Sequence, residues 1–558
     1  MAAPFTIFRA RRIHTMNPAR PTADAVAVLG DRVLGVGAVE ELAAWGDHDL
    51  DHRFADKILL PGFVEAHAHA MAGGMWAFPY VGFHDRPDPT GRTWPGCRSI
   101  RDVVERLAAA DAELEDPTRV LVAWGLDPIF LPGERLGAVH LDQVSTTRPV
   151  FVFHASGHLA TVNHALLRHE GITEETPTPG VARDDRGELT GELQEPAAMA
   201  LAASAFAVMM AELGADEAKR GFGQEARNAG HTCITDLGTS RLTEPGAVDA
   251  WRRTVEDPDY PARVMVALNG ALGGTDAAGA AASAELATRL RHDSTDKLHF
   301  GIVKLILDGS IQGFTARLDW PHYFRPPPGH PGNGLWLIPP DQMADLVTEF
   351  HRAGLTVHCH CNGDQATEVF VDAVATALER HPRPDHRHTV QHCQLTTPAQ
   401  YRRMGALGMC ANLFTNHLYY WGDQHREITV GPDRAEGMDA CATALRHGVA
   451  LSIHSDAPIT PLGHLHTAWC AVNRRTASGR TLGPDESIPV GAALHAITLG
   501  AAHQLRLDHV LGSIEVGKYA DFAVLDDDPL EVAPHELRDI PVWGTVLGGV
   551  PQPAGTDG

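Results

Sequence analysis

Eight short apolar segments alternate with longer amphipathic or alanine-rich stretches through the middle of the chain. This alternation is typical of successive β-strand and α-helix units and favours a parallel sheet or barrel. Eight such units close a TIM barrel, so the expected fold class is α/β with a (β/α)8 TIM barrel. The predicted strands are residues 58–67, 232–237, 262–267, 301–307, 355–360, 388–392, 408–412 and 449–456.

The first two predicted strands are separated by about 165 residues, far more than a β/α connection needs. We therefore expect an inserted α+β subdomain after the first barrel strand, at about residues 77–220. Both chain ends contain short segments that alternate apolar and turn residues. Neither end has enough strands to be stable alone, so together they predict a small β-sandwich. The predicted domains are the sandwich, 1–57 with 505–558, and the barrel with its insert, 58–504.

The charge balance limits the classes of partner. The chain has 46 Lys and Arg against 70 Asp and Glu, a net charge of −24. Such a charge argues against nucleic acid or an anionic membrane surface as a partner. No apolar run is long enough to span a bilayer, and the first residues lack the apolar region of a signal peptide. We expect a cytoplasmic protein with a small-molecule substrate, and a homodimer as the default assembly.

Two histidines close the first predicted strand, in the segment LLPGFVEAHAH. Alternate residues of a strand face the same side, so His67 and His69 can bind one ion at the carboxyl end of the strand. Barrel active sites lie at that end. The His-x-His pattern alone is weak because the chain has 33 histidines, and the alternative is two structural histidines.

Lys304 is the lone lysine in the apolar segment GIVKLILDG. Burial favours the neutral amine, which can add CO₂ to form a carbamate whose oxygens bridge two divalent cations. The alternative is a salt-bridged lysine, with Asp308 as the partner.

Three more candidate ligands, His360, His392 and Asp456, each close another predicted strand. Any one of them alone is better explained by a core or surface role. All six candidates at the mouth of one barrel are explained more economically by a metal site.

With these residues in place, the chain resembles the amidohydrolase superfamily of metal-dependent TIM-barrel hydrolases. The HAH motif after PGF, Lys304, His360, His392 and Asp456 match the ligands that this family carries on strands one, four, five, six and eight. The long insert and the ASGHLATVN, HCNGD and SDAP segments resemble the branch that contains N-substituted formamide deformylase. EAHAH departs from that branch, in which Asp or Ser more usually precedes the His.

The resemblance implies hydrolysis of a C–N bond in an amide-type substrate, such as an N-substituted formamide, another linear amide, a carbamate or a cyclic amide. It implies two Zn²⁺ per chain, with Mn²⁺ or Fe²⁺ as alternatives. His67 and His69 would bind one ion, His360 and His392 the other, and carboxylated Lys304 would bridge them. Asp456 would complete the set of ligands around the first ion and carry the proton from the attacking water to the leaving amine.

Position in the chain suggests four substrate-binding residues. His158 and Asn163 lie in the insert, in a polar segment that matches the same branch, and the alternative for them is helix capping and turn bonding. Trp76 and Tyr323 belong to loops that should face the barrel mouth, where they would contact an apolar substituent. Their alternative role is to pack the insert against the barrel.

Two other functions stay open. One is a mononuclear deaminase of an aminated heterocycle, with Lys304 unmodified. The other is a catalytically inactive protein that binds metal. Metal content distinguishes the bridged hydrolase from these two alternatives, because about two ions per chain favour the hydrolase and one or fewer favours either alternative.

Overall fold

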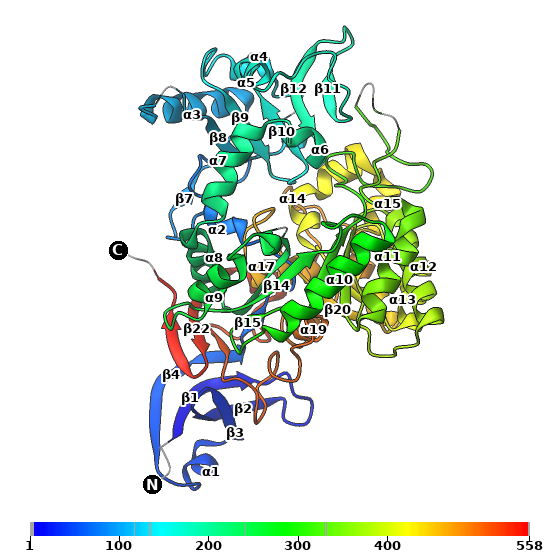
Figure 1. Cartoon of the computed structure of the whole chain (residues 1–558). Coiled ribbons are helices and arrows are strands. Elements are labelled where there is room, and N and C mark those ends of the chain that lie inside the picture. Colours follow the sequence, from blue (N-terminus) through cyan, green and yellow to red (C-terminus); the bar gives the residue numbers. More distant parts are fainter. Residues whose placement is uncertain are drawn as a thin grey trace.

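The computed structural model describes residues 5–116, 118–131, 133, 135–239, 241–327, 330 and 332–555. Three parts follow one another along its long axis, with a terminal sheet at one end, a barrel in the middle and the insert at the other end (Figure 1). Among the described residues, no helix is both long and apolar enough to cross a bilayer.

Eight parallel strands stand side by side in chain order and form the barrel sheet. Hydrogen bonds from Asp456 N–H to the His67 carbonyl (3.1 Å) and from His69 N–H to the Ala457 carbonyl (2.8 Å) link the ends of its first and last strands. The predicted α/β barrel is confirmed. Its strands are β5 (Phe63–Val64), β13 (His231–Thr239), β14 (Arg263–Asn269), β16 (Ile302–Ile306), β17 (Thr356–Cys361), β18 (Thr389–His392), β19 (Cys410–Leu413) and β20 (Ala450–Ile453), and β15 (Leu298–His299) pairs with β14.

Helices pack against these strands and bury their apolar side chains in the largest core of the protein. The strands are buried on both faces, which explains why they appear in the sequence as continuous apolar runs. The helices are α2 (Met71–Met75), α8 (Asp216–Asn228), α9 (Ala247–Val255), α10 (Ala277–His292), α11 (Pro340–Arg352), α12 (Asp364–Arg380), α13 (Pro398–Leu407), α14 (Asn416–Gln424), α15 (Pro432–Glu436), α16 (Cys441–Arg446), α17 (His464–Asn473), α18 (Val490–Ala496) and α19 (Leu499–Gln504).

The terminal sheet has seven strands that come from both ends of the chain, in the order β23–β22–β21–β4–β1–β2–β3. Phe54 joins its two parts, because its ring lies 5.6 Å from that of Phe8 and 5.1 Å from that of Trp543. This arrangement fits the predicted β-sandwich. The strands are β1 (Phe5–His14), β2 (Thr22–Leu29), β3 (Arg32–Gly37), β4 (His48–Pro61), β21 (Phe522–Leu525), β22 (Val542–Leu547) and β23 (Val550–Pro553), with α1 (Val39–Ala43) after β3.

The first predicted barrel strand, residues 58–67, is divided between two sheets. Ile58 to Pro61 belong to β4, where they pair with β21, and only Phe63 and Val64 form β5. The chain passes between the sheets at Gly62, where a Cβ atom would lie 1.9 Å from Thr232 Oγ1. The run is apolar on both sides of Gly62, so its pattern does not reveal the transfer.

The insert is the predicted α+β subdomain. Its five-stranded sheet has the order β11–β12–β10–β9–β8, with helices packed around it at the top of Figure 1. Its elements are α3 (Ile100–Glu113), β8 (Leu121–Leu126), α4 (Ala138–Leu141), β9 (Val150–His154), β10 (Leu159–Val162), α5 (His164–Glu170), β11 (Val181–Arg183), β12 (Leu189–Gln194), α6 (Glu195–Met199) and α7 (Ala203–Leu213).

Candidate metal centre

His67, His69 and Asp456 meet where the first and last barrel strands end. Asp456 Oδ1 lies 3.4 Å from His67 Nε2 and 3.2 Å from His69 Nε2. The His67 and Asp456 side chains are buried, whereas that of His69 is 30% exposed. The centre is therefore most accessible on the His69 side.

Lys304 enters the same centre from β16. Its Nζ lies 3.1 Å from His67 Nε2. Burial lowers the pKa of Lys304 to about 8, which makes the neutral amine readily available near neutral pH. Asp308, the alternative ion-pair partner, accepts instead from the backbone N–H groups of Arg317, Asn362 and Gly363, at 2.9–3.0 Å.

Gln391 fixes the orientation of the His67 ring. Its Oε1 lies 2.7 Å from His67 Nδ1 and also accepts from Asn412 Nδ2 at 2.9 Å. An amide oxygen can only accept, so Nδ1 of His67 carries the proton and Nε2 has a free lone pair. A residue that orients a ligand in this way is typical of metal sites.

His360 and His392 line the opposite wall, with ring centroids 4.4 Å apart. His392 Nδ1 lies 3.8 Å from Asp456 Oδ2, so this pair joins the first group. The Nε2 of His360 lies 3.1 Å from both the Gly309 carbonyl and Asn362 Nδ2. Each of the six predicted ligands thus lies next to at least one other, although His360 Nε2 faces the Gly309 carbonyl and the Asn362 amide.

The structure adds His454, which the sequence reasoning missed. Its ring stacks on His67 at 4.4 Å, and ligand atoms of His67, His392 and His454 lie within 4.8 Å of one another. Its spacing offers a signal, because His454 and Asp456 alternate after β20 as His67 and His69 do after β5.

A further buried group, Glu65, His231 and His464, lies beside the centre, and ligand atoms of these residues also lie within 4.8 Å of one another. Glu65 accepts from His67 N–H at 2.9 Å and from Ser455 N–H at 3.0 Å. Burial raises the pKa of Glu65 to about 8. Glu65 therefore ties the residues that follow the first and last strands to each other.

The donor set fits divalent transition-metal ions. Among the described residues, both ring nitrogens of His392 and of His454 and Oδ1 of Asp456 are buried without a hydrogen-bond partner. Burial lowers the pKa of His67, His360 and His392 well below the usual range, so these rings are neutral, the form that binds metal. Imidazole and carboxylate ligands suit Zn²⁺, Mn²⁺ and Fe²⁺.

Of the four predicted substrate-binding residues, His158 lies beside the centre, with its ring 5.6 Å from that of His360. Asn163 does not contact the centre. Its Oδ1 accepts from Leu166 N–H at 3.0 Å and caps α5, and its Nδ2 donates to the Ser145 and Arg148 carbonyls. The capping role explains this asparagine.

Trp76 and Tyr323 also have structural roles. Trp76 packs 5.1 Å from Trp124 in the insert core and donates to Glu225 Oε1 at 3.0 Å. Tyr323 is buried and its hydroxyl donates to the Ala316 carbonyl at 2.9 Å. In the structure these aromatic residues pack the loops, and their contact with a substrate stays a prediction.

A cavity of about 350 Å³ opens beside His69. Its wall combines apolar side chains from helices with Asp236, whose Oδ1 accepts from Ala70 N–H at 3.1 Å. The apolar residues are Met71, Met210, Leu213, Ala247, Ala250 and Trp251.

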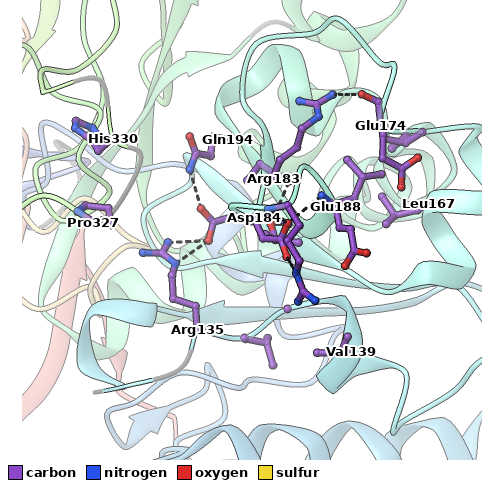
Figure 2. Close-up of a pocket in the computed structure, with 18 of the residues that line it drawn as sticks. Arg135, Val139, Leu167, Glu174, Arg183, Asp184, Glu188, Gln194, Pro327 and His330 are labelled. Atoms are coloured by element: carbon purple, nitrogen blue, oxygen red, sulfur yellow. Dashed lines mark hydrogen bonds and ion pairs between the residues drawn. The ribbon is translucent and has the colours of Figure 1, made fainter.

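A larger cavity of about 1110 Å³ lies between the insert and the loop after β16. Figure 2 shows Arg135 of the insert on one side and Pro327 and His330 on the other. Arg135 donates to Glu192 at 2.7 and 3.0 Å. None of the predicted metal ligands is among the described residues that line this cavity.

Comparisons with known proteins agree over nearly the whole chain. The profile of the Amidohydrolase family matches residues 55–552. The chain is 27% identical to the protein LONG AFTER FAR-RED 3 of Arabidopsis thaliana, over 96% of this chain and 89% of that protein. It is 25% identical to N-substituted formamide deformylase of Arthrobacter pascens, over 96% of each.

Among solved structures, an uncharacterised metal-dependent hydrolase from Pyrococcus horikoshii is similar with a TM-score of 0.69. The match covers 95% of this chain and 99% of that chain, at 20% identity. At this identity the likeness supports the fold.

Proposed function

The chain belongs to the amidohydrolase family and is a hydrolytic enzyme that acts on carbon–nitrogen bonds, and from this premise we propose that it hydrolyses an amide-type substrate at a two-metal centre. The substrates we propose are N-substituted formamides, other linear amides, carbamates or cyclic amides. One observation carries the proposal. Asp456 lies within 3.8 Å of ring nitrogens of His67, His69 and His392, and its Oδ1 is buried without a hydrogen-bond partner among the described residues.

We assign His67, His69 and Asp456 as the residues that would hold one ion and His360 and His392 as those that would hold the other, with carboxylated Lys304 as a ligand that both would share. Bound divalent ions lower the pKa of water to near neutrality and polarise a carbonyl. The neutral Lys304 amine attacks CO₂, so that an N–C bond forms while one C=O π bond breaks, and the nitrogen gives a proton to solvent water, which leaves a carbamate. Its two oxygens would add anionic ligands for the divalent ions that the surrounding histidines and Asp456 would hold.

Asp456 carries the proton. Its Oδ1 takes a proton from the attacking water and donates it to the leaving nitrogen, so the carboxylate is regenerated in each cycle. His67 and His392 do not compete for this proton at neutral pH, because burial keeps their pKa values low.

The cavity beside His69 supports an apolar substituent on the substrate. Met71, Met210, Leu213 and Trp251 provide its apolar surface, and its volume of about 350 Å³ suits a small organic molecule. Asp236 and Glu244 provide carboxylates in the lining of this cavity, and Asp236 is the proposed acceptor for a substrate N–H group.

The test is metal content by elemental mass spectrometry, on protein purified without chelators or a metal-binding tag, followed by turnover of a panel of N-alkyl and N-aryl formamides, acetamides, carbamates and lactams. We expect about two ions per chain and hydrolysis of at least one panel member. One ion or fewer together with no amide turnover would contradict the proposal and favour a mononuclear deaminase or an inactive protein.

Lys304→Ala tests the bridge directly. We expect this variant to lose at least one ion per chain and at least about 100-fold in kcat, because the bridging ligand is removed. Lys297→Ala is the matched control, since Lys297 is a half-buried lysine that donates to the Asp257 and Tyr260 carbonyls outside the centre. Full metal content and activity in Lys304→Ala would reject the carbamate bridge.

A further inference from the structure

His158 and Glu195 form a pair that the insert presents to the metal centre. Glu195 Oε2 lies 2.8 Å from His158 Nδ1, and Glu195 N–H donates to the His158 carbonyl at 2.7 Å. The His158 ring lies 5.6 Å from that of His360. Two bonds, one from the side chain and one from the backbone, therefore hold this histidine beside a candidate ligand.

The backbone of Glu195 adopts an unusual conformation. Its φ angle is +65°, in the left-handed region that non-glycine residues rarely occupy. Such conformations are strained in non-glycine residues and cluster at functional sites. At this position β12 ends and α6 begins, so the strained residue directs its side chain toward the barrel.

Glu195 is packed tightly against the loop after β16. A Cβ atom on Gly309 would lie 2.8 Å from Glu195 Oε1 and 2.2 Å from Thr315 Oγ1, so only glycine fits there. The Gly309 carbonyl in turn contacts His360 Nε2 at 3.1 Å. Glu195 thus touches the wall of the centre itself.

Glu195 occupies only Nδ1 of His158. The His158 side chain is 15% exposed, and no described residue hydrogen-bonds to its Nε2. Oε1 of Glu195 is buried, also without a hydrogen-bond partner among the described residues. The pair therefore leaves one ring nitrogen available on the side of the centre.

We infer that Glu195 is a positioning residue, which fixes the His158 ring so that Nε2 hydrogen-bonds to the amide group of the substrate at the metal centre. The inference rests on the proposed amide hydrolysis and gives the insert a direct part in it. A carboxylate that holds a histidine in one orientation and tautomer is a recurrent device at active sites.

The test is a double-mutant cycle with the panel substrate that the wild-type enzyme turns over fastest. We expect Glu195→Ala and His158→Ala each to lower kcat/KM about 30-fold with full metal content, as loss of one hydrogen bond to a charged group predicts. The double variant should match His158→Ala within about twofold, because Glu195 acts through His158. Glu195→Gln should retain activity within about fivefold, since its amide oxygen still accepts from Nδ1.

Glu192→Ala is the matched control. Glu192 is a buried glutamate of β12, three residues before Glu195, but it pairs with Arg135 at 2.7 Å instead of with His158. We expect this variant to keep kcat/KM within about threefold of wild type. Additive losses in the cycle, or equal losses in Glu192→Ala and Glu195→Ala, would overturn the inference, because both results indicate a structural role.

A probe that does not depend on turnover separates this inference from the proposed function. Acetohydroxamate chelates divalent ions and carries an amide-like group, and its Kd can be measured by calorimetry on each metal-loaded variant. We expect about tenfold weaker binding to Glu195→Ala and unchanged binding to Glu192→Ala. If no panel amide is hydrolysed, the proposed function is wrong, but calorimetry with acetohydroxamate still tests the positioning role of Glu195. Equal affinity of acetohydroxamate for Glu195→Ala and Glu192→Ala would reject that role.

Discussion

At the scale of single residues, Asp456 has the most demanding position in the centre, because it must help to hold an ion and also exchange a proton. Asp456→Asn keeps an oxygen that can bind metal but cannot accept a proton. We expect about two ions per chain to remain and kcat to fall about 1000-fold, the range for loss of a general acid and base.

The comparison uses steady-state kinetics with elemental analysis of the same preparation. Asp528→Asn is the control, since Asp528 is a buried aspartate that bonds His14 in the terminal sheet, 2.9 Å away. Normal turnover by Asp456→Asn would remove the proton-carrying role from Asp456.

The residues that could be predicted at this scale share one property, because each lies within or closes an apolar segment. His67, Lys304 and Asp456 carry that local signal, and the structure brings them together. Gln391 does not, since its importance comes from a bond to His67, which lies 324 residues away. Asn163 does carry a local signal, but that signal is ambiguous. A polar loop segment has the same sequence pattern whether its asparagine binds a ligand or caps a helix.

At the scale of elements, the stability of the insert depends on side chains that hydrogen-bond to backbone groups at the ends of helices and strands. Asn163 caps α5 through Leu166 N–H and also accepts from Val150 N–H at the start of β9, at 3.0 Å in each case. Removing it leaves both N–H groups and two carbonyls without this partner. We expect Asn163→Ala to destabilise the insert by about 2–3 kcal/mol and to leave KM unchanged.

Limited proteolysis at increasing urea concentration, with cleavage mapped to residues 77–220, would measure the loss of insert stability. His169→Ala provides a control, since His169 lies in α5 itself and is exposed. A large rise in KM for Asn163→Ala, without loss of stability, would return Asn163 to the substrate site.

Elements could be predicted where one sheet accounts for a whole apolar run. The segments 355–360 and 388–392 nearly coincide with β17 and β18. The run at 58–67 does not coincide with one strand, because β4 and β5 share it and the change of sheet at Gly62 depends on Thr232, which is distant in sequence. Local patterns record burial, but they do not record which partner provides it.

At the scale of the whole molecule, the many neutral buried histidines make stability sensitive to acid. Burial lowers the pKa of His154 and His464 to about 4 and that of His358 and His466 to about 3. In the unfolded chain these groups titrate near 6.5, so the unfolded state binds more protons below that pH. Their contribution is complete above pH 6.5 and declines as the pH falls toward 4.

For His154 alone this loss amounts to about 3 kcal/mol at pH 4. We expect the urea midpoint to fall steeply between pH 6.5 and 4.5, as measured by circular dichroism. His154→Gln should make the pH dependence shallower, whereas His292→Gln should not, because His292 is exposed at the end of α10. A urea midpoint that stays constant over this pH range would contradict the assignment of these histidines as neutral.

The terminal sheet also has a consequence for how the protein is made. Strand β4 leaves the ribosome well before its partner β21, which begins about 460 residues later. At roughly 5–20 residues per second, synthesis of the intervening chain takes about 25–90 s. Throughout that time the edge of β4 has unpaired N–H and C=O groups that could pair with another nascent chain. Expression at low temperature or with limiting chaperones should therefore expose the first 61 residues, rather than the barrel, as the main source of aggregation.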